Sequence, residues 1–290
     1  MRLIIISVLL IRSLLAIDTL SFSATEVKNG ESVLILFSSQ EILCDVKMRF
    51  QGRDFSFFPH PLDSEKRYLI LPVHYNTPEG EKSLTLSYSR GKKRIKEKIP
   101  PLIVTKGSYP KESLRVDPAK IKLSKKDKKR AEKEYLQAMK IYNRSTQTFH
   151  IECETCLPMS SIMTSHFGNE RLFNGVRKSY HSGVDYRAKT PSDVAAIGNG
   201  VVVLKDDRFY AGFSLIVDHG HGIYTGYYHL SSAHVNVGDK VVKDQIIALT
   251  GQSGRVTGPH LHFSMKVQGV TVNPLVVLKQ INALLSQKNF

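Results

Sequence analysis

Apolar segments in this 290-residue chain are short, and turn residues separate them. In "VKMRF" (46–50) apolar residues alternate with basic ones, and in "SLTLSYS" (83–89) they alternate with serine and threonine. Because side chains i and i+2 share one face of a strand, this period of two predicts half-buried strands. Turn signals such as "NG" at 29–30 separate the segments. Residues 18–105 are therefore expected to form a small β-sandwich.

The next segment, residues 106–156, is expected to be a linker that contains one amphipathic helix. Ser124 followed by Asp127 resembles a capping box at the start of a helix. The helix should end near Asn143, and the residues before it should be irregular. Within this helix, apolar residues recur at helical spacing and predict the face that packs against a domain. These residues are Ala131, Tyr135, Ala138, Met139 and Tyr142.

From residue 157 to residue 290 glycines become frequent and the strands are again short. A helical pattern returns only near residues 276–285. We expect a second all-β domain here. The fold class predicted for the whole chain is mainly β: an N-terminal sandwich, a linker helix and a C-terminal β domain.

The stretch "TGPHLHF" (257–263) places two histidines one residue apart, directly after a turn. The alternation from His260 to Met265 predicts a strand that buries every second residue. Both imidazoles then project from its other face, with Cα atoms about 6.6 Å apart. Two histidines held rigidly on one face suit a metal site, or one ligand beside one acid–base group.

A catalytic zinc site usually takes three protein ligands, so this pair needs a partner. "HSGVD" offers His181 and Asp185 four residues apart, which share a face on a strand, and Gly183 leaves space between them. Two nitrogens and one carboxylate oxygen suit an open zinc site. A further candidate is His229 in "YYHLSS", which we expect on the same strand face as Tyr227.

"HSGVD", "YYHLSS" and "TGPHLHF", in that order, resemble the lysostaphin/LytM-type family of zinc peptidoglycan endopeptidases. The resemblance implies a two-sheet β peptidase domain with a substrate groove, and hydrolysis of peptide bonds in the stem or cross-link of peptidoglycan. It also implies that His181, Asp185 and His262 bind zinc. His260 would act as the catalytic base and His229 would stabilise the oxyanion.

The arrangement before this domain is similar to proteobacterial members of the family that carry an N-terminal immunoglobulin-like domain. That resemblance implies a DD-endopeptidase in a Gram-negative periplasm. Some such members also remove a terminal D-alanine as DD-carboxypeptidases, and relatives in spiral bacteria shape the cell.

The net charge of +15, from 41 basic and 26 acidic residues, suggests an anionic partner such as an acidic wall polymer. No nucleic-acid-binding signature accompanies the charge, so no nucleic-acid partner is expected. Residues 1–17 combine Arg2, an apolar run and the small residue Ala16, which predicts a secretory signal peptide. The alternative is an uncleaved anchor that associates the N-terminus with a membrane.

Three cysteines leave alternatives open. Cys153 and Cys156 could form a disulfide, a local staple or two idle thiols, and Cys44 is alone. His219 and His221 lie at a turn, and we expect both to be structural.

Other functions also remain open at the level of sequence. One is a non-catalytic wall-binding or amidase-activating protein on the same scaffold. A second is a zinc hydrolase that acts on small molecules, which a closed pocket rather than a groove would favour. A third is a basic wall binder whose peptidase is latent.

Overall fold

The computed structural model describes residues 6–11, 17–120, 122–175 and 177–286. These residues divide into two compact units. The first takes the described residues up to 107 together with those from 279 on, and the second takes residues 108–278. Both units are built mainly from strands, which confirms the predicted fold class.

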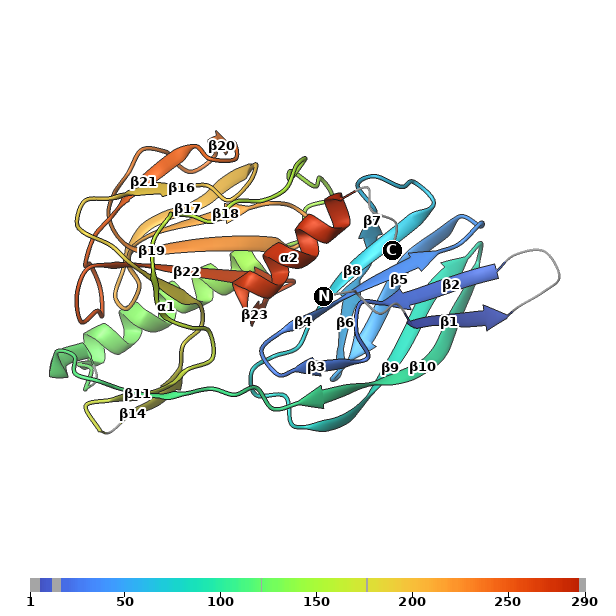
Figure 1. Cartoon of the computed structure of the whole chain (residues 1–290), viewed down its shortest axis with the longest axis horizontal. Coiled ribbons are helices and arrows are strands. Elements are labelled where there is room, and N and C mark those ends of the chain that lie inside the picture. The colour runs from blue at the N-terminus through green and yellow to red at the C-terminus, as the bar shows by residue number, and fades with distance from the viewer. Residues whose placement is uncertain (1–5, 12–16, 121, 176, 287–290) are drawn as a thin grey trace. The chain divides into compact units, whose positions relative to one another are not determined.

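The first unit contains two five-stranded sheets, drawn as two layers of blue to green arrows in Figure 1. In one sheet all neighbouring strands are antiparallel, in the order β1 (Ile6–Ile11), β2 (Ile17–Phe22), β4 (Ser32–Ser38), β8 (Lys66–Pro72) and β7 (Phe58–Pro59). The order in the other sheet is β3 (Glu26–Lys28), β10 (Lys93–Thr105), β9 (Gly80–Arg90), β5 (Leu43–Phe50) and β6 (Arg53–Ser56).

The core of this unit lies between the two sheets. Val46, Met48 and Phe50 of β5 are buried, as their alternation predicts. Phe37 of β4 contacts Tyr88 of β9 from the opposite sheet, with ring centroids 5.9 Å apart. The predicted β-sandwich is therefore confirmed.

The second unit is organised around one ten-stranded sheet. Seven strands follow each other across it in the order β12 (Met163–Ser165), β15 (Val184–Arg187), β22 (His260–Val267), β19 (Ile223–Ala233), β18 (Gly212–Asp218), β17 (Gly200–Arg208) and β20 (Lys240–Val241). Three more attach beside this path: β16 (Asp193–Ala195), β21 (Ile246–Thr250) and β23 (Val270–Val272).

A separate three-stranded sheet contains β11 (Lys111–Leu114), β13 (Glu170–Phe173) and β14 (Arg177–Tyr180). Strand β11 runs parallel to β13, and the predicted linker belongs to the second unit from residue 108 on. The expectation of irregular structure before the helix is wrong here. "KESL" is short and polar and gains its backbone partners only from a strand almost sixty residues away, which periodicity cannot show.

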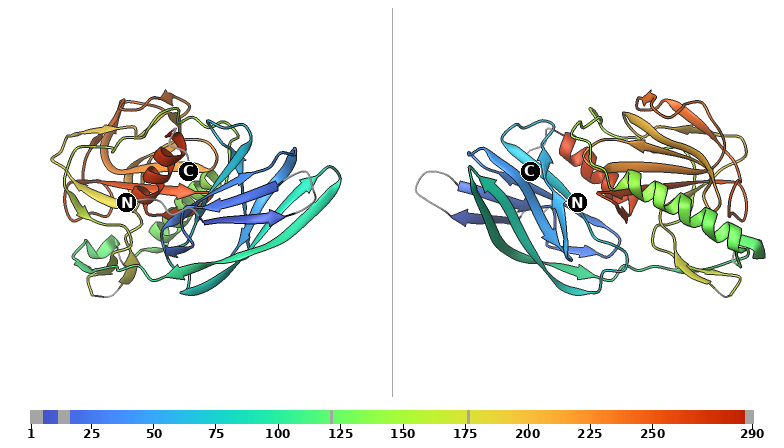
Figure 2. Two further views of the ribbon diagram at one scale, coloured as in Figure 1. Left: turned by 45° about the vertical axis from the view of Figure 1, so that its right-hand side comes forward. Right: turned by 180° about the vertical axis from the view of Figure 1, so that it is seen from behind.

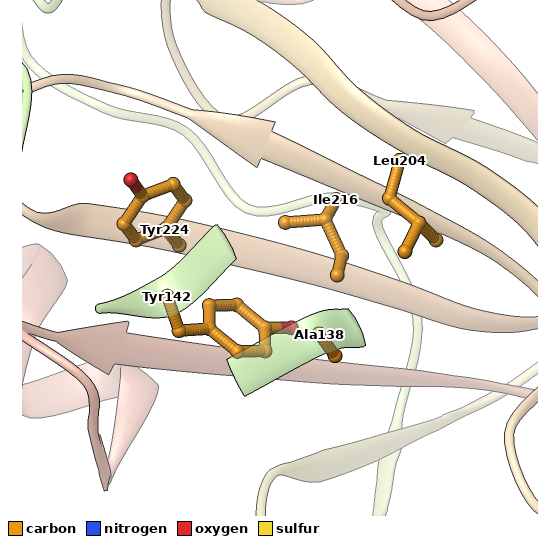
Figure 3. Close-up of a cluster of buried hydrophobic side chains, with 5 residues drawn as sticks. All are labelled: Ala138, Tyr142, Leu204, Ile216 and Tyr224. Atoms are coloured by element: carbon orange, nitrogen blue, oxygen red, sulfur yellow. The ribbon is translucent and has the colours of Figure 1, made fainter. Parts of the chain in front are cut away.

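Helix α1 (Lys125–Tyr142) begins and ends where the sequence predicts. Ser124 caps its N-terminus by accepting a hydrogen bond from the backbone of Asp127, and Asn143 is the C-cap. Figure 3 shows Ala138 and Tyr142 of α1 packed against buried residues of β17, β18 and β19. Only the C-terminal half of the predicted apolar face packs in this way. Tyr135, which was predicted to belong to this face, is 60% exposed.

In the right-hand view of Figure 2, α1 lies along the strands that it covers. A short 3-10 turn, η1 (Pro118–Lys120), precedes it, and α2 (Pro274–Leu285) forms where a helical pattern returns in the sequence.

The predicted signal segment, residues 1–17, lies partly outside the described residues. Its described part forms β1 and the first residue of β2. No helix among the described residues is long and apolar enough to cross a membrane. Cys44, Cys153 and Cys156 are free thiols.

Candidate metal centre and active site

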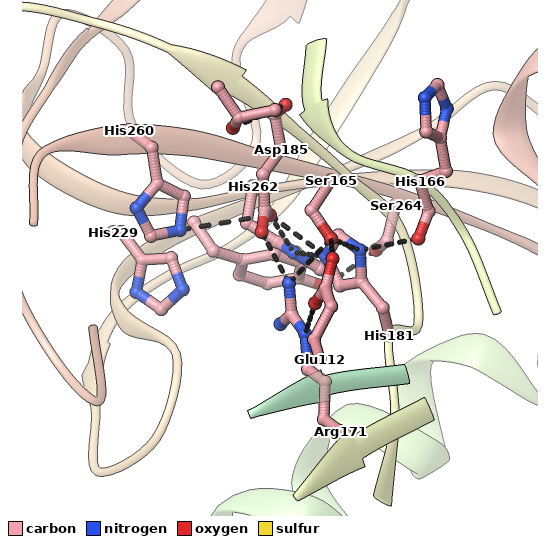
Figure 4. A network of polar contacts seen from close by, with 12 residues as sticks. Glu112, Ser165, His166, Arg171, His181, Asp185, His229, His260, His262 and Ser264 are labelled. Carbon is pink, nitrogen blue, oxygen red and sulfur yellow. Dashed lines mark hydrogen bonds and ion pairs between the residues drawn. The ribbon is translucent and has the colours of Figure 1, made fainter. Parts of the chain in front are cut away.

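Strands β15 and β22 are antiparallel neighbours and place Asp185 directly opposite His262. His181 lies four residues before Asp185, just ahead of β15, and its ring points toward the same place (Figure 4). The predicted alternation of β22 holds, because Leu261 and Phe263 are fully buried on the other face of that strand.

The three side chains converge on one point. Nε2 of His181 lies 2.9 Å from Oδ1 of Asp185 and 2.8 Å from Nδ1 of His262. Nδ1 of His262 lies 2.8 Å from the same Asp185 oxygen. Two imidazole nitrogens and a carboxylate oxygen that face one another in a buried site are a donor set suited to a transition metal.

Neighbouring groups fix the orientation of both histidines. Nδ1 of His181 lies 2.9 Å from the carbonyl oxygen of His166, so this nitrogen carries the proton and Nε2 presents a lone pair. The ring of His262 packs against Gly183. A Cβ at Gly183 would come within 2.8 Å of Nε2 of His262 and 2.3 Å of the carbonyl oxygen of Phe263.

The electrostatic environment keeps Asp185 ionised and His262 neutral. Burial alone would raise the pKa of Asp185, but the hydrogen bonds and charges of His181 and His262 hold it well below its usual range. Burial lowers the pKa of His262 to about 4 and outweighs its contact with Asp185. At neutral pH the site therefore presents a carboxylate and a neutral His262 ring, the protonation states that metal ligation requires.

A polar network that no sequence motif predicts supports the three converging side chains from one side (Figure 4). Nη2 of Arg171 lies 2.6 Å from Oδ2 of Asp185, and its Nε donates to Oε2 of Glu112 at 3.0 Å. The other oxygen of Glu112 accepts from Ser165 at 2.7 Å and from Asn169 at 2.6 Å. Ser165 in turn lies 3.0 Å from Nδ1 of His181, one of the three converging side chains.

His260 and His229 lie on the other side of the ligands, with ring centroids 4.8 Å apart. Nδ1 of His260 lies 2.8 Å from the carbonyl oxygen of Gly258, and Nδ1 of His229 lies 2.9 Å from that of Ser253. A carbonyl can only accept, so both Nδ1 atoms are protonated and both Nε2 atoms are acceptors in the neutral rings. Nε2 of His260 is 3.8 Å from Oδ1 of Asp185.

The local path of β19 differs from the expected alternation. His229 has a left-handed backbone, with φ of 61°, and this residue breaks the period of two. Tyr228 and His229 therefore both line the site, whereas Tyr227 faces the opposite side, where its hydroxyl accepts from the backbone of Ile197. The expectation that Tyr227 and His229 share a face is wrong for this reason.

All five residues predicted for the site thus lie together. Comparison with known families identifies the segment that carries them: the model of peptidase family M23 matches residues 179–274. This segment is a peptidase family M23 domain.

Named proteins are similar to a part of this chain. Peptidoglycan DD-endopeptidase ShyA of Vibrio cholerae is 39% identical over 114 residues, which cover 39% of this chain and 26% of ShyA. DD-carboxypeptidase/endopeptidase Mpg of Neisseria gonorrhoeae is 36% identical over 97 residues, which cover 33% of this chain and 22% of Mpg. The chain thus spans only about a quarter of the length of these curated relatives.

A solved structure is similar over a larger part of the chain. The crystal structure of a Pseudomonas aeruginosa protein assigned to peptidase M23 aligns with a TM-score of 0.61 and 21% identity. The alignment covers 81% of this chain and 92% of that one. At this identity the likeness concerns the fold alone.

The site opens into a groove lined by residues of α1, of the strands β11, β13, β15, β17, β19, β22 and β23, and of neighbouring segments. Two acidic residues line it, Glu112 and Asp185, and both belong to the network around the ligands. Five basic residues also line it: Arg171, Arg187, Arg208, Arg255 and Lys266. The groove is therefore cationic away from the ligands.

The two histidines expected to be structural lie outside the ligand group. His219 is fully buried, with its ring nitrogens against the carbonyl oxygen of Asn199 and the hydroxyl of Thr225. His221 stacks on Phe149 at a ring distance of 5.2 Å. Neither lines the groove.

Proposed function

We propose that this protein is a zinc-dependent peptidoglycan hydrolase that cleaves peptide bonds in the stem or cross-link of the cell wall. The observation that carries the proposal is the convergence of His181, Asp185 and His262 at 2.8–2.9 Å, beside two further histidines, in a groove. The names of relatives point to the same substrate and to bonds between D-amino acids. We therefore favour DD-endopeptidase activity, together with DD-carboxypeptidase activity.

In this proposal His181, Asp185 and His262 hold the metal through Nε2, Oδ1 and Nδ1. The donor set fits Zn²⁺, which accepts imidazole and carboxylate ligands. Bound there, zinc would lower the pKa of a water molecule and polarise the scissile carbonyl.

The remaining residues handle protons and charge. Nε2 of His260 is an acceptor beside the ligands, so it takes the proton of the attacking water and returns it to the leaving amine. His229 can stabilise a developing oxyanion only when Nε2 carries a second proton, because Nδ1 already donates to Ser253. Burial lowers the pKa of His229 well below its usual range, and His260 and His262 lower it further when they are protonated, which opposes that second proton in the free protein.

The proposed place of action is the periplasm, after export through the N-terminal segment, and the proposed role is wall remodelling that contributes to cell shape. The net charge of +15 favours contact with an acidic polymer. We also propose that the sandwich is an immunoglobulin-like domain, as the sequence suggests.

Digestion of purified muropeptides, with products identified by mass, tests the proposal. Cross-linked dimers should yield monomers, and pentapeptides should lose a terminal D-alanine. Excess chelator should stop both reactions, and added zinc should restore them. If intact dimers and pentapeptides remain after incubation with zinc-loaded protein, the proposed activity is wrong.

The same experiment addresses the non-catalytic alternatives. A wall-binding or amidase-activating protein would bind muropeptides without changing their mass. The presence of all five site residues in one arrangement favours the enzyme. A hydrolase of small molecules would leave dimers intact and is excluded by their cleavage.

A further inference from the structure

Lys266 lies on the same face of β22 as the two histidines of the site. Alternate residues of this strand line the groove: His260, His262, Ser264 and Lys266. Lys266 comes four residues after the ligand His262, which places their Cα atoms about 13 Å apart along the strand. The ammonium group therefore belongs to the groove but lies well away from the ligands.

Among the described residues, no acidic side chain pairs with Lys266. Its Nζ donates to the hydroxyl of Thr271 on the adjacent strand β23 and lies 5.0 Å from the centre of the Tyr142 ring. Burial and the positive charge of Arg208 lower the pKa of Lys266 to about 8, so most of the amine remains charged at neutral pH. None of the ion pairs found among the described residues includes Lys266.

Arg208, at the end of β17, is the second positively charged side chain in this part of the groove. Its Nη2 donates to the main-chain oxygen of Glu134 at 3.2 Å, and its Nε is buried without a hydrogen-bond partner. The carboxylate of Glu134 is engaged elsewhere, by Arg130 at 2.6 Å and by the backbone of Phe209 at 2.7 Å. Arg208 therefore also lacks a carboxylate partner within the described part of the chain.

Two cations that share a groove without a counter-charge are costly, because each loses hydration and repels the other. Neither carboxylate of the groove relieves this, since Glu112 and Asp185 are held by Arg171 and the ligand histidines. A bound anion would supply the missing charge and accept hydrogen bonds from both groups.

We propose that Lys266 and Arg208 form an anion subsite of the groove, which binds a carboxylate of the stem peptide at a distance from the scissile bond. The proposal rests on the proposed function, because it takes its ligand from peptidoglycan. Stem peptides carry free carboxylates, and the spacing along β22 selects one that is set back from the reacting carbonyl. Tyr142 of α1 forms the wall against which the Lys266 ammonium lies.

Binding of a stem tetrapeptide, which lacks both a cross-link and the fifth residue, tests the subsite without any cleavage. We would measure its Kd by calorimetry for the zinc-loaded protein. The same measurement is made for peptides in which one carboxylate at a time is converted to a carboxamide. A charge-assisted hydrogen bond is worth about 10- to 100-fold in affinity. One of the carboxamides should bind the wild-type protein more weakly by that factor, and the others should bind about equally well.

Three variants locate the effect. Lys266→Met keeps most of the side-chain volume and should bind the free acid and every carboxamide with the same, weaker affinity. Lys266→Arg keeps the charge and should retain the discrimination. Lys240→Met removes one charge from an exposed position on β20, outside the groove, and should behave as the wild type.

Three outcomes overturn the subsite: no measurable binding of the free acid to the wild type, equal binding of all peptides, or discrimination that survives in Lys266→Met. Cleavage of dimers alongside any of these leaves the proposed function standing. Discrimination that Lys266→Met abolishes supports the subsite even if no muropeptide is cleaved, so the two proposals can fail separately.

Discussion

Arg171 joins Asp185 to Glu112: its Nη2 lies 2.6 Å from Oδ2 of the ligand, and its Nε lies 3.0 Å from Oε2 of the glutamate. The register of the small sheet creates this arrangement, because β11 and β13 pair in parallel with Glu112 opposite Arg171. Two residues outside the segment matched by the M23 family, Arg171 and Glu112, thus hold the orientation of a proposed metal ligand.

Glu112→Gln should therefore weaken metal binding. Groups that orient metal ligands are typically worth about 10- to 100-fold in affinity. The amide loses the charge that holds Arg171 in place, while its remaining oxygen still accepts from Ser165 or Asn169. Competition with a chelator measures the affinity. Glu170→Gln changes an exposed neighbour on β13 and should have no effect. Equal affinity of the two variants would contradict the positioning role.

His262→Ala should lose metal and activity together, because it removes one of the three converging donors. His260→Ala should keep the metal and lose about 10²- to 10⁴-fold in activity, the usual worth of general acid–base assistance. His229→Ala should resemble His260→Ala. Metal stoichiometry and muropeptide cleavage on each purified variant distinguish them. Loss of metal from His260→Ala, with metal retained in His262→Ala, would reverse the assignment.

Gly183→Ala should disturb the site through a single methyl group. The added Cβ would meet the carbonyl oxygen of Phe263 at 2.3 Å and Nε2 of His262 at 2.8 Å, so β22 or the ligand ring has to move. We expect weaker metal binding in a folded protein. Gly258→Ala is the matched control, since a Cβ there meets nothing within 4 Å although Gly258 also lines the groove. Unchanged affinity in Gly183→Ala would show that the site tolerates the methyl group.

The second unit should lose stability in acid through His219. Burial lowers its pKa from the ordinary 6.5 to about 4, against the hydrogen bond to Asn199. Between these values the unfolded chain binds a proton that the folded chain rejects, so the free energy of unfolding falls as the pH decreases from 6.5 to 4. The whole effect is about 3 kcal/mol.

Hydrogen exchange in β19, measured on metal-free protein at several pH values, reports this stability. In His219→Gln the residue no longer titrates, so the dependence on pH between 6.5 and 4 should be shallower than in the wild type. Parallel curves for the two proteins would rule out His219 as a source of the acid sensitivity.

The parts of the fold that could be predicted from sequence are those governed by local rules. Period-two alternation located β5 and β22, and the cap at Ser124 located the start of α1. The histidines of the proposed metal site could be predicted because their spacing within two short motifs, "HSGVD" and "TGPHLHF", itself indicates a metal site. Tyr135 was misplaced because helical spacing cannot say how far the partner surface extends along a helix.

The supporting parts of the site depend on contacts between distant segments. Glu112 reaches Arg171 through a parallel pairing across almost sixty residues, and "KESL" has no pattern that reveals it. Tyr228 enters the groove because His229 adopts a left-handed backbone, which interrupts the alternation that the sequence displays. Lys266 follows the alternation of β22, but its lack of an acidic partner is visible only in three dimensions.

Strand β11 also bears on how such a peptidase could be exchanged between proteins during evolution. A recombination event that moved only residues 179–274 would transfer every proposed ligand together with His229 and His260, yet leave Glu112, Ser165 and Arg171 behind. The recipient protein would gain the proposed ligands without the side chains that orient them. In this chain, a segment that carries both the proposed ligands and the side chains that orient them would therefore have to include β11, which begins at Lys111.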